Sequence, residues 1–110
     1  MAVDLTARIA QLRQQLGGPR DGALLRYSLG SALFDSGALK EAAEMLGHAV
    51  LADPGYSAAW KLAGKVRLAM DDPAGAAHQW QQGIEAARQR GDKQAEKEMT
   101  VFLRRLTPPA

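Results

Sequence analysis

Cysteine is absent from this chain of 110 residues, and its aromatic residues are only two each of Trp, Tyr and Phe. Without cysteine the chain has no disulfide, thiolate metal ligand or cysteine nucleophile, which fits a reducing compartment. Its first residues lack the apolar core of a signal peptide, because Asp4, Arg8 and Arg13 interrupt them. No apolar run approaches the length needed to cross a bilayer. We therefore expect a cytoplasmic protein with no membrane association.

The residues that are plentiful favour helices. Hydrophobic residues make up 46% of the chain and charged residues 24%, as in an ordinary globular protein. Alanine, leucine and glutamine are abundant while aromatic residues are few, which favours helix over sheet. The length predicts one domain, residues 1–110, that is large enough to bury a core.

The net charge of +2 is unevenly placed along the chain. Residues 1–56 carry five Lys and Arg against six Asp and Glu, whereas residues 57–110 carry nine against six. This excess of cations in the second half has two interpretations, which the sequence leaves open. It reflects ordinary solvated helix faces, or it favours an acidic partner.

Capping and breaking signals divide the chain into six helices with short connections. Asp4, Asp21 and Asp72 are the expected side-chain caps of the first, second and fifth helices. Gly37 is expected to end the second helix in the left-handed conformation. No stretch alternates convincingly enough to be a strand, so the predicted fold class is all-α. The expected helices cover about residues 5–16, 22–35, 39–52, 57–70, 73–90 and 92–106.

Two segments of the chain repeat the same layout at an offset of 34 residues. Gly30 and Gly64 lie at matched positions in the middle of helices, although glycine there costs about 1 kcal/mol relative to alanine. The pair therefore indicates a place where two helices pack closely. Alanines match at the same offset: Ala42 with Ala76, Ala43 with Ala77, and Ala52 with Ala86.

This pattern resembles the tetratricopeptide repeat (TPR), whose signature is W-x2-L-G-x2-Y, then A-x3-F, then P. Arg26 and Arg67 depart from the signature, because they replace a large apolar residue and a tyrosine. The resemblance implies a right-handed superhelical stack of antiparallel helix hairpins. Residues 1–18 would form an N-terminal helix, 23–56 and 57–90 the two repeats, 92–106 a capping helix and 107–110 a tail. The matching residues are Leu29, Gly30, Leu33, Ala42, Leu46 and Pro54 in the first copy, and Trp60, Ala63, Gly64, Ala76 and Trp80 in the second.

The resemblance also implies a binding surface. In this family the second, fifth, ninth and twelfth residues of each repeat commonly face a concave groove. Such a half-apolar, half-basic groove would suit a peptide with a hydrophobic side chain and an acidic group. The other interpretation is that the aromatic residues pack against neighbouring helices and the lysines are ordinary solvated residues. The residues at these positions are Leu24, Tyr27, Ser31 and Phe34 in the first copy, and Ala58, Lys61, Lys65 and Leu68 in the second.

Residues with catalytic or metal-binding chemistry form no recognisable set. His48 and His78 lie at non-equivalent places of the two repeats without a nearby set of ligands, so we expect no metal site. Residues 17–20 lack the context of a phosphate-binding loop, and Ser28 and Ser31 lack a base partner. We expect no enzymatic activity and no cofactor.

The function predicted from the sequence is that of a protein–protein interaction module, an adaptor that binds a peptide segment of a partner in its short groove. The alternative is a structural subunit that associates with itself, as a homo-oligomer, or with a larger assembly. Nucleic-acid binding is not favoured, because no helix presents the clustered polar and basic residues of a recognition helix.

Overall fold

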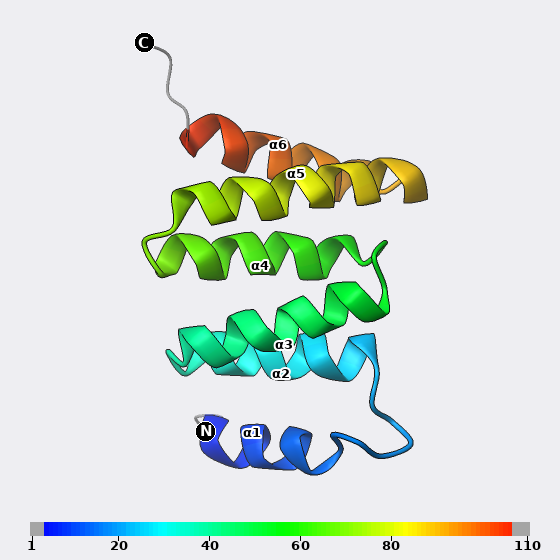
Figure 1. The fold of residues 1–110 in the computed structure, drawn as a ribbon, viewed down its shortest axis with the longest axis vertical. Coiled ribbons are helices and arrows are strands. Elements are labelled where there is room, and N and C mark those ends of the chain that lie inside the picture. The colour runs from blue at the N-terminus through cyan, green and yellow to red at the C-terminus, as the bar shows by residue number, and fades with distance from the viewer. Residues whose placement is uncertain (1–3, 107–110) are drawn as a thin grey trace.

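A computed structural model describes residues 4–106, which form six α-helices (Figure 1). The described residues contain no strand, which confirms the predicted all-α class. The expected tail, residues 107–110, lies outside this range. None of the helices in residues 4–106 has the length and apolar character to span a membrane. The helices are α1 (Leu5–Gln14), α2 (Ala23–Asp35), α3 (Leu39–Ala52), α4 (Ser57–Ala69), α5 (Pro73–Arg90) and α6 (Lys93–Leu106).

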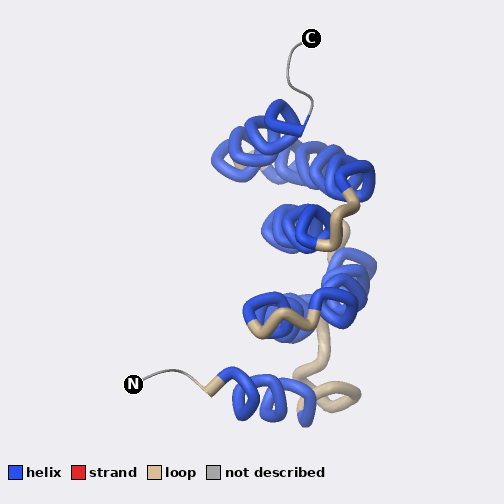
Figure 2. The backbone as a smooth tube through the Cα atoms, turned by 90° about the vertical axis from the view of Figure 1, so that its left-hand side faces the viewer, coloured by secondary structure: helices blue, strands red, loops and turns tan. Residues whose placement is uncertain are grey.

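The helices stack in chain order along an elongated molecule of 46 × 28 × 25 Å. Seen from the side, α2, α4 and α6 lie along one edge of the stack, and α3 and α5 lie along the other (Figure 2). Helix α4 contacts both α2 and α6, whereas the backbones of α3 and α5 do not come within contact distance of each other. The layer of α2, α4 and α6 is therefore the more closely spaced one. We call its exposed side the inner face.

Local signals explain most helix ends. The Asp4 carboxylate accepts a hydrogen bond from the backbone N–H of Thr6 at 3.0 Å, and Asp72 accepts one from Gly75 at 2.9 Å. Gly37 follows α2 with a φ of +86°, in the left-handed region that glycine adopts without steric cost. Helix α1 ends at Gln14, slightly before the expected end. The backbone N–H groups of Gln15 and Leu16 bond to the carbonyl oxygens three residues earlier, as in a 3₁₀ turn, and no longer four residues earlier as in an α-helix.

The prediction that Asp21 caps the second helix is wrong. The capping position of α2 is Gly22, which makes no side-chain hydrogen bond to the helix. The Asp21 carboxylate instead accepts hydrogen bonds from the backbone N–H of Gly17 and from the Arg26 side chain. A charged guanidinium is a stronger donor than a backbone amide, so Arg26 competes successfully for this carboxylate.

The matched glycines lie where helices meet closely. A Cβ atom placed on Gly30 would be 2.8 Å from Cγ of Leu46, which is a fully buried residue of α3. A Cβ atom on Gly64 would collide with the indole ring of Trp80 on α5. The close packing that the sequence indicated at Gly30 and Gly64 is thus confirmed at both positions.

The core consists of apolar clusters between successive helices. One lies among α2, α3 and α4 and contains Leu29, Leu33 and Leu46. Another joins α5 to α6 through Trp80 and Met99, which are 2% and 0% exposed. Helix α6, the expected capping helix, covers this second cluster with its apolar residues Met99, Phe102, Leu103 and Leu106.

Candidate functional site

The residues predicted to line the groove lie on α2 and α4, the first two helices of the inner face. Leu24 and Leu68 are large apolar residues that stay exposed, with exposed fractions of 71% and 43%. Lys65 is also exposed, whereas Ser31 and Ala58 are half-buried. The predicted residues thus include both exposed and partly covered side chains.

Tyr27 and Phe34 are half-buried and each has a packing role. The Tyr27 ring stacks on Tyr56 in the α3–α4 connection, with ring centroids 5.1 Å apart and an interplanar angle of 17°. Burial raises the pKa of the Tyr56 phenol above its usual value, and the neighbouring Tyr27 and Asp53 add to this effect. Phe34 packs against the cluster among α2, α3 and α4. Both aromatic residues therefore help to hold the helices together.

The two groove lysines face α6, which the sequence had indicated only as a cap. Nζ of Lys61 lies 3.3 Å from a carboxylate oxygen of Glu98. Nζ of Lys65 lies 5.3 Å from the centre of the Phe102 ring, a cation–π distance. Helix α6 therefore borders the inner face beside α4. The sequence of α6 does contain an apolar stripe, which indicates that α6 packs against another helix. The spacing of this stripe does not reveal which helix lies next to α6.

A hydrogen-bond network at the start of α6 fixes its position. The Asp92 carboxylate accepts hydrogen bonds from the backbone N–H of Ala95 and from the Ser57 hydroxyl at the start of α4. These bonds lower the pKa of Asp92, and the charge of Lys61 contributes in the same direction. The first turns of α4 and α6 are thus joined side by side.

A cavity of about 310 Å³ lies between the C-terminal turns of α4 and α6. We call it the terminal pocket. Trp80 of α5 is a buried wall of this pocket, and its ring packs at 5.2 Å against Phe102. No Asp or Glu is among the lining residues. The terminal pocket is lined by Lys65, Leu68, Trp80, Phe102, Arg105 and Leu106.

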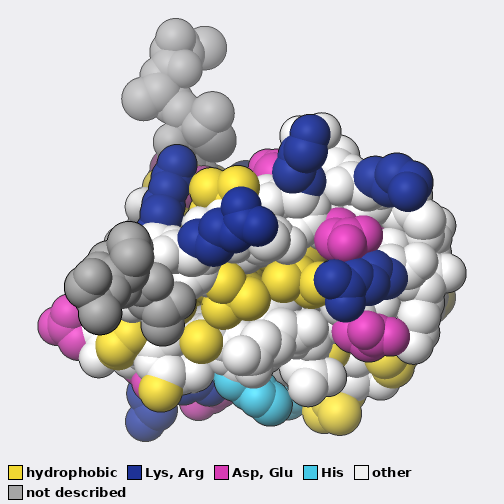
Figure 3. Space-filling model, turned by 90° about the horizontal axis from the view of Figure 1, so that it is seen from above, with side chains coloured by type: hydrophobic (Ala, Val, Ile, Leu, Met, Phe, Trp, Pro, Cys, Tyr) yellow, Lys and Arg dark blue, Asp and Glu magenta, His cyan; other side chains and the backbone are white. Residues whose placement is uncertain are grey.

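The α6 end of the stack is basic. Figure 3, which looks down on this end, shows Lys and Arg side chains bordering a strip of hydrophobic side chains. Four exposed cations belong to α6 itself, and none of them forms an ion pair within residues 4–106. These are Lys93, Lys97, Arg104 and Arg105.

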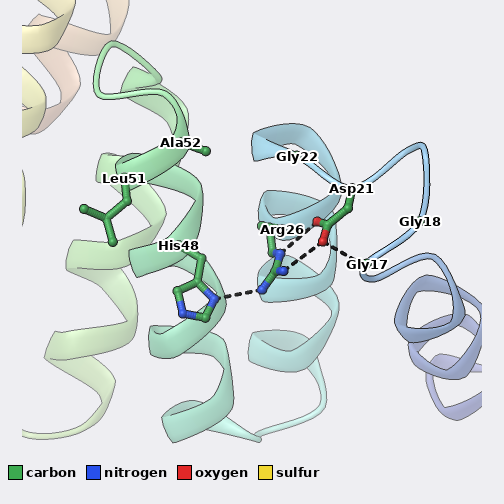
Figure 4. A pocket seen from close by; sticks show the side chains of 8 residues that line it. All are labelled: Gly17, Gly18, Asp21, Gly22, Arg26, His48, Leu51 and Ala52. Carbon is green, nitrogen blue, oxygen red and sulfur yellow. Dashed lines mark hydrogen bonds and ion pairs between the residues drawn. The ribbon is translucent and has the colours of Figure 1, made fainter.

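A second hollow lies at the other end of the stack, between the α1–α2 connection and α3 (Figure 4). Its centre is Arg26, whose Nε and Nη2 donate to the two oxygens of Asp21, both at 2.9 Å. Nη1 of Arg26 lies 2.8 Å from Nδ1 of His48 on α3. Leu51, which is 80% exposed, projects away from this network. All three guanidinium nitrogens of Arg26 are thus engaged by the protein itself.

The sequence pattern presented Arg26 only as a departure from an apolar position of the repeat. Its structural role is to connect α2 with α3 and with the α1–α2 connection, since Asp21 also accepts the N–H of Gly17 at 2.8 Å. The hydrogen bond from Arg26, with that from Gly17, lowers the pKa of Asp21 from 3.8 to about 2. The signal in the sequence was the spacing of Asp21 and Arg26 across the start of α2.

This ion pair predicts a defined pH dependence. A carboxyl group whose pKa is lower in the folded than in the unfolded chain stabilises the fold above its unfolded pKa, and the effect is lost as the pH falls through the folded pKa. The difference in melting temperature between wild type and Asp21→Asn should therefore be largest above pH 4 and shrink between about pH 4 and pH 2.

Thermal melting followed by circular dichroism across this range measures the difference. Asp35→Asn is the control, because Asp35 is exposed and makes no ion pair within residues 4–106. It should melt close to wild type throughout. A constant difference between wild type and Asp21→Asn down to pH 2 would contradict the assigned role of the pair.

Metal-binding groups do not converge in the described part of the chain. Within residues 4–106 no three His, Asp or Glu side chains are placed so that they could hold a metal ion. His48 contacts Arg26, and Asp72 caps α5.

Comparison with known proteins agrees with this architecture. No family model matches the chain. It is 53% identical over 98 residues to the TPR repeat-containing protein PA0015 of Pseudomonas aeruginosa. This match covers 89% of this chain and 93% of that protein. The solution structure of protein BPP2914 from Bordetella parapertussis matches with a TM-score of 0.76 at 40% identity, over 96% of this chain and 89% of that one.

Two further solved structures share the fold. The TPR domain of Sgt2 from Aspergillus fumigatus matches with a TM-score of 0.70 at 29% identity, over 96% of this chain and 75% of that one. MamA matches with a TM-score of 0.71 over 93% of this chain and 66% of that one, but at 19% identity it supports the fold alone. The TPR fold is that of a protein–protein interaction module in general. With 53% identity over nearly the whole of the P. aeruginosa relative, this chain belongs to the tetratricopeptide repeat family.

Proposed function

We propose that this chain binds a segment of a partner protein along the inner face formed by α2, α4 and α6. The observation that carries the proposal is the exposure of large apolar side chains on neighbouring helices of this face. Leu24 on α2 and Leu68 on α4 are 71% and 43% exposed, and both are at positions that the family resemblance assigns to the groove. Large apolar side chains that stay exposed at groove positions of both repeats support a role of this face in binding.

The charges of the inner face support a partner with acidic residues. Lys65 forms no ion pair within residues 4–106, and the basic end of the stack at α6 lies next to it. A basic surface speeds the approach of an acidic segment and selects against a basic one. Tyr27 and Phe34 are half-buried and would add partly exposed ring surface to the contact.

Self-association through an apolar surface, the alternative function, has less support. The large apolar residues that are most exposed within residues 4–106 are Leu24, Leu51, Leu68 and Val101, and each is on a different helix. No single described helix therefore offers the continuous apolar side that a stable homodimer usually buries. Light scattering over a range of protein concentrations measures the oligomeric state directly.

Two matched substitutions test the proposed face. The immobilised chain would first capture a partner from a lysate of the cells that produce it. Leu24→Asp on the inner face should then reduce the amount captured by about tenfold, since an interface residue that matters contributes about 1–2 kcal/mol. Leu51→Asp adds the same charge to an 80% exposed leucine on α3, and should leave capture unchanged.

Lys65→Glu and Lys40→Glu form a second matched pair, on α4 and α3. Both lysines are exposed, and only Lys65 lies on the inner face. The proposal is wrong if Leu51→Asp or Lys40→Glu on α3 loses the partner. It is also wrong if Leu24→Asp and Lys65→Glu both still capture the partner while their circular dichroism matches that of wild type.

A further inference from the structure

We infer that the terminal pocket is the anchor site of this surface, and that it takes a bulky apolar side chain whose flanking residues in the partner are acidic. The inference rests on the proposed function, because the pocket lies beside Lys65 and Leu68 of the inner face. It adds the position at which the partner is held, and the chemistry by which the partner is selected.

The walls of the pocket require an apolar group. Leu68 and Leu106 contribute aliphatic surface, and the rings of Trp80 and Phe102 contribute aromatic surface. The indole N–H of Trp80 already donates to the carbonyl oxygen of Lys61 at 3.0 Å, so it has no hydrogen bond left to offer a ligand. A volume of about 310 Å³ is at the small end of the range of about 300–1,000 Å³ for ligand cavities. It therefore suits a side chain rather than a large ligand.

The rim of the pocket selects the charge of the flanking residues. Lys65 is on α4 and Arg105 on α6, so exposed cations stand on two sides of the apolar walls. The ion pairs within residues 4–106 involve six other cations, Arg13, Arg26, Lys61, Arg67, Arg88 and Arg90. Lys65 and Arg105 are therefore available to form charge-assisted hydrogen bonds with carboxylates on either side of a bound side chain.

A second copy of this chain is a poor occupant. The α6 end carries four exposed cations without ion-pair partners in the described residues, so symmetric pairing of two such ends would bring like charges together. Stacking α6 of one copy on α1 of the next would meet a further exposed arginine, Arg8, which forms no ion pair within residues 4–106. The charge of the pocket thus favours a different, acidic protein segment.

The probe is a capped pentapeptide with phenylalanine at its centre and two acidic residues on each side. Two matched peptides carry alanine at the centre, or lysine at all four flanking positions. Titration of the full ¹⁵N-labelled chain, followed by two-dimensional NMR, reports where each peptide binds. The tryptophans give an internal comparison, because the Trp60 indole donates to the carbonyl oxygen of Pro54, away from the pocket, while Trp80 forms its wall.

The acidic phenylalanine peptide should shift the indole signal of Trp80 and the amide signals of Phe102 and Arg105, and leave the Trp60 indole signal in place. We expect the alanine and lysine peptides to bind at least about tenfold more weakly. Arg105→Glu should weaken the binding of the acidic peptide by a similar factor. Arg104→Glu makes the same change at the next residue, which does not line the pocket, and should alter binding by less than about threefold.

Each other outcome overturns the inference. Equal binding of the lysine peptide would remove the charge selection, and equal binding of the alanine peptide would remove the apolar anchor. Shifts confined to α2, around Leu24 and Ser31, would place the anchor elsewhere on the inner face and leave the proposed function standing. Absence of binding by all three peptides at millimolar concentration would also overturn it, while the Leu24→Asp capture experiment would judge the proposed function separately. Signals of the pocket that move with protein concentration alone would identify a second copy as the occupant.

Discussion

Trp80→Ala is expected to lower the free energy of unfolding by about 3–5 kcal/mol. Trp80 is 2% exposed and lies at the centre of the cluster that joins α5 to α6. Its removal would leave a cavity between Gly64 and Phe102, and would also leave the carbonyl oxygen of Lys61 without its indole donor. The total stability of a domain is only about 5–15 kcal/mol, so the variant would be marginally folded.

Urea denaturation followed by far-UV circular dichroism measures this loss. Trp80→Phe is the informative companion, since it retains an aromatic ring and removes the hydrogen bond. It should cost less than alanine, by a difference of about 1–3 kcal/mol. A Trp80→Ala variant within about 1 kcal/mol of wild type would show that α6 is held by other contacts.

Gly30→Leu should destabilise the chain by about 1–3 kcal/mol, because the new side chain has no space. Even its Cβ atom would stand 2.8 Å from Cγ of Leu46, whose side chain is fully buried and cannot move aside without disturbing α3. The result would be a wider separation of α2 and α3, and therefore a change in the inner face. The shift in the midpoint of urea denaturation reports the cost.

Gly47→Leu provides a control with the opposite expected sign. Gly47 is also in the middle of a helix, α3, but a Cβ atom placed on it meets nothing within 4 Å. Leucine has a higher helix propensity than glycine by up to about 1 kcal/mol, so this variant should be as stable as wild type or more stable. If both glycine variants were equally destabilised, helix position rather than close packing would explain the repeat glycines.

The helix boundaries and the class of fold could be predicted because their determinants are local. Asp4, Asp72 and Gly37 act on the backbone within a few residues of their own positions. The repeat glycines carried longer-range information, since a glycine in mid-helix is explained only by a neighbour that packs closely. Both kinds of signal are visible in a single sequence.

The site was predicted less completely because side-chain partners are chosen in three dimensions. Asp21 has the position of a helix cap, but Arg26 and Gly17 compete for its carboxylate and determine its role. The position of α6 beside α4 also could not be predicted from the sequence pattern. As a result, Phe102 and Arg105 were not assigned to the binding surface, although they line the terminal pocket.

Helix α1 differs from the other helices in having no buried residue and in having close backbone contacts with α2 alone, while its Arg13 reaches α3 through an ion pair with Glu41. Its opening should therefore expose less apolar surface than the opening of a hairpin, and we expect local stability to rise from α1 toward the centre of the stack. The backbone N–H of Gly17 donates to the Asp21 carboxylate and so holds the α1–α2 connection in place. We therefore expect such an opening to stop at Gly17. We therefore expect α1 to open and close as a separate cooperative unit while the hairpins α2–α3 and α4–α5 remain folded.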